Sequence, residues 1–70
     1  MKEKYPLAVN TLNFPVQYDY NGQQIFDKDG NMVCDIRGWG RIQKLSQPEL
    51  RQDQIGEMIA ELINSVQPAL

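Results

Sequence analysis

The sequence predicts a small α+β domain, in which a three-stranded antiparallel β-meander packs against one C-terminal α-helix. Two dipeptides that favour tight turns, Asn21-Gly22 and Asp29-Gly30, separate short runs rich in Val, Ile, Tyr and Phe, which is the pattern of consecutive hairpins. In the last third of the chain, apolar residues recur at spacings of three and four, as in an amphipathic helix. A length of 70 residues suits one domain with a core of limited size.

The segment before the first strand, residues 1–13, is expected to form a flexible arm, or an extra edge strand that uses Leu7 and Val9. Its apolar run is too short for a signal peptide or a membrane span. The single folded domain is expected to span residues 14–67.

Three strands are expected near residues 14–20, 23–28 and 31–37. If both turns are two-residue loops, Ile25 lies opposite Tyr18 and Cys34 and faces the core. If both are three-residue loops with a glycine bulge, Phe26 takes that place, and mixing the two loop types would put polar residues inside. Either register turns the same set inward: Val16, Tyr18, Met32, Cys34 and Ile36. The outer face then keeps the other of Ile25 and Phe26, together with Val33, as a modest apolar patch.

The helix of the second half is expected to begin at a capping box formed by Ser46 and Glu49, with Pro48 in its first turn. Gly56 costs a helix roughly 1 kcal/mol relative to alanine, and it indicates a close approach of the helix to the sheet. Pro68 ends the helical pattern. The apolar stripe expected to face the sheet comprises Ile55, Met58, Ile59, Leu62, Ile63 and Val66.

The composition excludes several kinds of site. The chain has no histidine and a single cysteine, Cys34, so it forms no internal disulfide, and a zinc site would need carboxylates almost alone. Cys34 is expected to face the core, where a thiol is unreactive. The string DKDGN at 27–31 resembles the start of a calcium loop, but its glycine comes too early, so a tight turn is preferred. Without a histidine base, an activated nucleophile or a phosphate loop, neither enzymatic activity nor a cofactor is expected.

The stretch DIRGWGRIQK, residues 35–44, holds the candidate partner-binding residues: Arg37, Trp39, Arg41 and Lys44. An exposed Trp flanked by Arg is suited to base stacking or to anchoring a protein interface. The preferred interpretation is that Trp39 covers one end of the core and that the arginines face solvent, since a domain this small rarely spares its largest apolar side chain. The predicted helix also carries Asp53, Glu57 and Glu61, which form either an acidic docking face or, as preferred, a solvated back.

The D-x-D-G hairpin, the RGWGRIQ string and the helix IGEMIAELIN together resemble small uncharacterised proteins of bacteriophages and prophages. The likeness covers roughly residues 22–65. It implies a phage or prophage origin and a bacterial cytoplasm, and it transfers no catalytic residue.

The expected function is therefore that of a non-enzymatic accessory protein that binds another protein, of the host or of the phage. The alternative is a weak nucleic-acid-binding module that uses Arg37, Trp39, Arg41 and Lys44, although a net charge of −2 argues against a general nucleic-acid binder. No membrane association is expected. The outer apolar patch is modest, so a monomer is expected, with a weak homodimer as the alternative.

Overall fold

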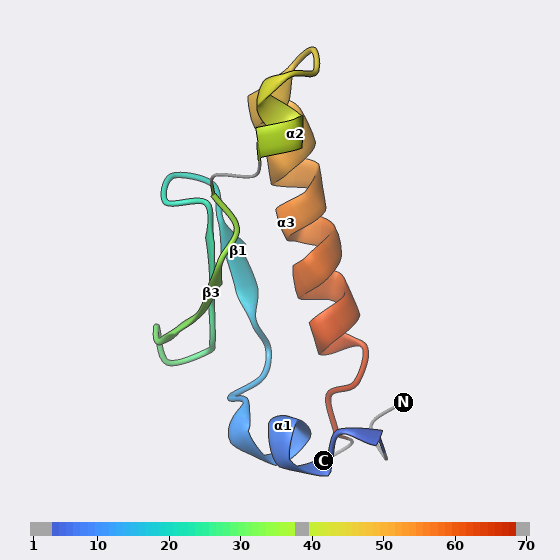
Figure 1. Ribbon diagram of the computed structural model, residues 1–70. Coiled ribbons are helices and arrows are strands. Elements are labelled where there is room, and N and C mark those ends of the chain that lie inside the picture. The colour runs from blue at the N-terminus through green and yellow to red at the C-terminus, as the bar shows by residue number, and fades with distance from the viewer. Residues whose placement is uncertain (1–3, 38–39, 69–70) are drawn as a thin grey trace.

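The computed structural model describes residues 4–37 and 40–68. These residues form a sheet of three antiparallel strands in the order β1-β2-β3, together with a C-terminal helix, so the predicted α+β class is confirmed. Helix α3 packs on β1 and β2, and α2 packs against α3 (Figure 1). The elements in chain order are α1 (Pro6–Thr11), β1 (Gln17–Asp19), β2 (Gln24–Phe26), β3 (Met32–Asp35), α2 (Gly40–Gln43) and α3 (Pro48–Asn64).

Both predicted turns are present, and an aspartate organises each. In the first, the Asp19 carboxylate accepts the backbone N–H groups of Asn21 and Gly22, at 3.1 and 3.2 Å. In the second, the Asp27 carboxylate accepts those of Asp29 and Asn31, both at 2.9 Å. An aspartate that hydrogen-bonds the backbone two residues on is the usual Asx-turn arrangement. The DKDGN string is therefore a tight turn that uses its first carboxylate internally.

The register resolves which of Ile25 and Phe26 faces the core. Ile25 lies opposite Tyr18 on β1 and opposite Cys34 on β3. Its side chain is fully buried, whereas Phe26 is only half-buried. This is the pairing expected for two-residue loops. The second loop nevertheless has three residues, 28–30, because the Asp27 N–H donates to the Asn31 carbonyl at 2.8 Å.

A bulge in β3 makes the three-residue second loop compatible with this register. Phe26 pairs with Met32 while Ile25 pairs with Cys34, so Val33 is an extra residue between two paired positions. Two predictions are wrong for this reason. Met32 was expected to face inward but is 56% exposed, and Val33 was expected to face outward but packs against the core. The first loop spans residues 20–23, because Asp19 pairs with Gln24 and the Gln23 N–H donates to the Asp19 carbonyl at 2.8 Å. The expectation for a mixture of two- and three-residue loops therefore stays a prediction.

Helix α3 meets the sheet through a row of residues at i, i+4 spacing: Gln52, Gly56 and Ala60, all buried. Met58 lies two residues from both Gly56 and Ala60, which is about 200° around a helix, so it points away from the sheet. It is 52% exposed, and Leu62, equally displaced from Ala60, is 60% exposed. The prediction that the whole apolar stripe faces the sheet is therefore wrong for these two residues.

The predicted close approach at Gly56 is confirmed. A β-carbon at this position would lie 2.3 Å from Cε1 and 2.4 Å from Cδ1 of Tyr18, far inside van der Waals contact. The ring of Tyr18 thus occupies the space that a side chain would fill. It belongs to the buried cluster with Val16, Ile25 and Ala60.

An amide side chain joins the two ends of the domain. Asn64, the last residue of α3, accepts the Val16 N–H through Oδ1 at 2.7 Å and donates from Nδ2 to the Val16 carbonyl at 2.9 Å. It thereby satisfies both backbone groups of Val16, as a neighbouring strand would. This pair of hydrogen bonds fixes the C-terminal end of α3 to the beginning of β1.

The first turn of α3 differs from its prediction. Pro48 does begin the helix, but the N-cap is Gln47, with φ of 52°, and no side chain caps the helix. The predicted capping box of Ser46 and Glu49 is therefore wrong. Arg51 instead holds Ser46, since its Nε donates to the Ser46 carbonyl at 2.6 Å. The Ser46 hydroxyl also accepts from Arg51 Nη2 at 3.3 Å, instead of capping the helix.

The N-terminal segment contains helix α1 rather than an edge strand. Leu7 and Val9, on which the edge-strand alternative depended, both lie in this helix, and Leu7 is 80% exposed. Pro6 at its first position favours the helical start. Within residues 4–37 and 40–68, no helix is long and apolar enough to cross a bilayer.

Candidate protein-binding surface

Three of the four predicted partner-binding residues, Arg37, Arg41 and Lys44, lie in the described part of the chain. Arg37 follows β3, is exposed, and is held by Asp35 through Nε–Oδ1 and Nη2–Oδ2 contacts of 3.1 and 2.7 Å. Arg41 lies in α2 and Lys44 just after it, and both are exposed. Trp39 lies outside the described residues, so its packing against the core stays a prediction.

The Asp35–Arg37 pair reduces the charge that the site offers a ligand. Hydrogen bonds from the Arg37 side chain and backbone hold the pKa of the Asp35 carboxyl well below its usual range. A guanidinium that already binds a carboxylate at two points has fewer free donors for a phosphate. Of this stretch, the structure buries Ile42, which is 2% exposed where α2 packs on α3.

A more continuous surface lies on the side of α3 that the sheet leaves uncovered. We call it the outer face of α3, and it contains two adjoining depressions that share Gln54 and Met58. The first is mainly apolar and runs between α2 and α3; its lining residues are Ile42, Leu45, Arg51, Gln54, Ile55 and Met58. Leu62, 60% exposed, extends the apolar surface by one helical turn beyond Met58.

The second depression is acidic and lies along the edge of α3 nearest β1. Its lining residues are Tyr20, Leu50, Asp53, Gln54, Glu57, Met58 and Glu61. The three carboxylates follow one another at i, i+4 spacing, and none of the lining residues is a Lys or Arg. The acidic stripe thus lies beside the exposed apolar side chains of Leu50 and Met58, and both the solvated back and the acidic docking face stay predictions.

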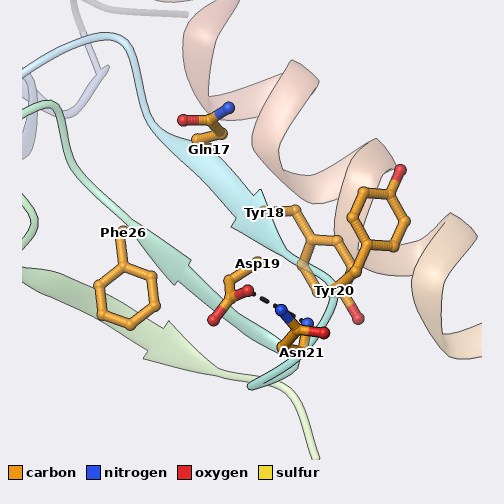
Figure 2. Close-up of a pocket in the computed structure, with 6 residues that line it drawn as sticks. All are labelled: Gln17, Tyr18, Asp19, Tyr20, Asn21 and Phe26. Carbon is orange, nitrogen blue, oxygen red and sulfur yellow. Dashed lines mark hydrogen bonds between the residues drawn. The ribbon is translucent and has the colours of Figure 1, made fainter.

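Two tyrosines of the first hairpin connect this edge to the sheet. Figure 2 shows the rings of Tyr18 and Tyr20 between β1 and α3, while Phe26 projects on the other side of the sheet. The two tyrosine rings meet edge to face, with centroids 5.0 Å apart. The Tyr18 hydroxyl donates to Asp53 Oδ1 at 2.8 Å. These contacts fix the hairpin relative to the acidic edge.

Two phenols near this edge, and the thiol of Cys34 in β3, have raised pKa values. Burial, together with the Asp53 carboxylate, raises the pKa of Tyr18 far above its usual value. The Glu57 carboxylate raises the pKa of Tyr20. Burial also raises the pKa of the Cys34 thiol, which keeps it protonated. A phenol or thiol with a raised pKa is a poorer nucleophile at neutral pH.

Among the residues that the structure describes, no group of three His, Cys, Asp or Glu side chains is placed to hold a metal ion. The Asp27 carboxylate, the strongest sequence candidate, instead accepts hydrogen bonds from the loop it closes and from Asn13 Nδ2 at 3.3 Å. The backbone hydrogen bond from Asn31 is the main cause of its lowered pKa.

The sequence pattern does not reveal the outer face of α3, because it assigns the apolar residues of this face to the core. The signal that could have found it is the pair of small residues Gly56 and Ala60. Small residues at i, i+4 spacing mark the side on which a helix approaches its neighbour most closely. Residues 200° away from that pair, such as Met58, must then face solvent or a partner.

Comparisons with known proteins add no assignment: no protein-family model, no curated protein and no solved structure matches the chain.

Proposed function

We propose that this protein is a non-enzymatic accessory protein, of phage or prophage origin, that binds another protein through the outer face of α3. The origin rests on the resemblance of the hairpin, the RGWGRIQ string and the C-terminal helix to small phage and prophage proteins. The observation that carries the binding function is the exposure of Met58 and Leu62, at 52 and 60%, beside the groove between α2 and α3.

The size of the domain gives this exposure its weight. Only five hydrophobic residues are buried among those that the structure describes. Full burial of a Leu or Met side chain is worth about 1.5–3 kcal/mol. Because the core is so small, the apolar surface that Met58 and Leu62 leave exposed is a significant fraction of what the domain could bury. A partner that covers them recovers it, and contiguous exposed apolar surface of this kind commonly marks interaction sites.

The nucleic-acid alternative has less support. Arg37, one of its four residues, already binds Asp35. The carboxylates of Glu57 and Glu61 on the outer face of α3 would repel phosphates. A protein partner needs neither a surplus of basic residues nor a free Arg37.

Site-specific photo-crosslinking in bacterial cells tests the proposed function. A photoreactive phenylalanine derivative replaces Leu62 in one variant and Met32 in the matched control. Both positions are large, apolar and similarly exposed, at 60 and 56%, but Met32 lies on the sheet face away from α3. The expected result is a discrete protein adduct from position 62, resistant to nuclease, and none from position 32.

The opposite pattern contradicts the proposal. An adduct from position 32 alone would move the binding surface to the open face of the sheet. A nuclease-sensitive adduct, or binding that weakens steeply with salt as counterion release requires, would favour the nucleic-acid alternative.

A further inference from the structure

We infer, on the basis of the proposed protein-binding function, that the partner presents a basic amphipathic helix to the outer face of α3. Its apolar residues would enter the groove between α2 and α3, and its Lys or Arg side chains would lie against Glu57 and Glu61. The inference follows from the placing of an apolar and an acidic depression side by side, with Met58 and Gln54 common to both.

The acidic depression has the chemistry of a site for a long cationic side chain. Asp53 already accepts the Tyr18 hydroxyl, and Glu57 is half-buried and interacts with the Tyr20 hydroxyl. Glu61 is exposed, so it is the carboxylate most open to a partner, with Glu57 one helical turn before it. Like charges at i, i+4 destabilise a helix slightly, and a cation placed between them removes that repulsion. Leu50 and Met58 supply apolar walls for the methylene stem of a Lys or Arg side chain.

The shape of the surface favours a helix as the occupant. Helix α3 has 17 residues, which corresponds to about 25 Å of length at 1.5 Å per residue. Ile55, Met58 and Leu62 recur along it at spacings of three and four, so they form a ridge beside the α2–α3 groove. An amphipathic helix that places its own apolar side chains at the same spacings fits such a surface.

Charge argues against a second copy of this chain in the same place. In an antiparallel pair of α3 helices centred near Met58, the flank with Glu57 and Glu61 would face the same flank of the other copy. Four carboxylates would then lie together without a cation between them. In a parallel pair the acidic flank would instead face the Ile55 side of the other helix, where Arg51, one turn before Ile55, already donates to the Ser46 carbonyl at 2.6 Å. A basic partner avoids both conflicts.

The test uses the full chain and three labelled synthetic peptides of about 18 residues, long enough to hold a helix. The first contains Leu and Lys in an amphipathic helical pattern, the second Leu and Glu in the same pattern, and the third has the composition of the first in a scrambled order. Fluorescence anisotropy measures each dissociation constant at low and high salt. We expect the first peptide to bind at least about tenfold more tightly than either of the others, and less tightly at high salt.

Matched variants identify the carboxylates. Glu57→Gln with Glu61→Gln should weaken binding of the Leu–Lys peptide by about tenfold. Glu49→Gln with Asp29→Asn changes the net charge equally, at exposed positions outside the acidic depression, and should leave binding nearly unchanged. Equal losses in both double variants, or equal binding of the Leu–Glu peptide, would overturn the inference.

The crosslinking result separates failure of the inference from failure of the proposed function. A protein adduct from position 62 that survives Glu57→Gln with Glu61→Gln would leave the protein-binding function standing and remove the basic partner. Absence of both the adduct and peptide binding would remove both.

Discussion

Replacing Gly56 by alanine should destabilise the protein, although alanine is the better helix former. Alanine is favoured over glycine in a helix interior by about 0.8–1.0 kcal/mol, so helix propensity alone predicts a more stable variant. The structure predicts the reverse, because the new methyl group would lie 2.3 Å from Cε1 of Tyr18. Either the ring or the helix must then move.

The magnitude follows from what that movement disrupts. Inserting a methyl group into a packed core typically costs about 1–3 kcal/mol. Displacing the buried ring also weakens the hydrogen bond from Tyr18 to Asp53, and a hydrogen bond to a charged group contributes about 1.5–3 kcal/mol. After the gain in helix propensity, a net loss of about 2–4 kcal/mol remains. For a domain of this size, 2 kcal/mol corresponds to a fall in melting temperature of about 8–16 °C.

Urea denaturation and thermal melts followed by circular dichroism measure the effect. The matched control is Gly40→Ala, since a β-carbon there meets no atom within 4 Å among the described residues beyond its chain neighbours. The stability of this variant should stay the same or rise by up to about 1 kcal/mol. In a Tyr18→Leu background the additional cost of Gly56→Ala should nearly disappear, because the ring that it meets is gone. A Gly56→Ala protein as stable as the original would refute the close contact between α3 and β1.

Three further outcomes are expected. Asn64→Asp keeps an acceptor for the Val16 N–H but loses the donor to the Val16 carbonyl. Urea denaturation at neutral pH should therefore show a loss of stability of about 1–3 kcal/mol. Unchanged stability would contradict the paired hydrogen bonds. The folded-state pKa of Tyr18 is raised, so its contribution to the free energy of unfolding is complete below the unfolded-state pKa of 10.0 and is lost as pH rises beyond that value. Tyr18→Phe should therefore lose less stability than the original protein over that alkaline range. Parallel curves of stability against pH for the two proteins would refute this. The folded-state pKa of Asp35 is lowered, so its contribution to the free energy of unfolding is present above pH 3.8 and is lost as pH falls below that value. In an NMR titration, Arg37→Ala should return the pKa of the Asp35 carboxyl toward 3.8. If Asp35 of the original protein already titrates there, its pairing with Arg37 is excluded.

The elements that short-range rules determine were predictable from the sequence. Both hairpin turns lie where Asn21-Gly22 and Asp29-Gly30 predict them, since a dipeptide of this kind restricts the backbone whatever surrounds it. Pro48 begins α3 as expected. The fold class follows from these local signals, because a meander and one helix leave few ways to bury a common core.

The bulge at Val33 was not predictable, because it satisfies two constraints that only the assembled sheet imposes. The second loop has the three-residue geometry, with Gly30 at φ of 86°, yet Ile25 must still lie opposite Cys34 for both to pack in the core. An extra residue in one strand resolves the conflict. Nothing in the composition of β3 distinguishes Val33 from its neighbours in advance.

The rotation of α3 was predictable only in part, and it links the stability of the domain to its surface. The apolar stripe of α3 is wider than the sheet can cover, so packing has to choose one side of it. The contact between Tyr18 and Gly56 decides the choice, because only a residue without a side chain admits the ring. In this orientation α3 lies close to β1 and Asp53 accepts the Tyr18 hydroxyl, but Met58 and Leu62 stay outside the core. Substituting a larger residue at Gly56 would therefore disturb more than stability. It would turn or lift α3, and with it the outer face that the proposed partner recognises.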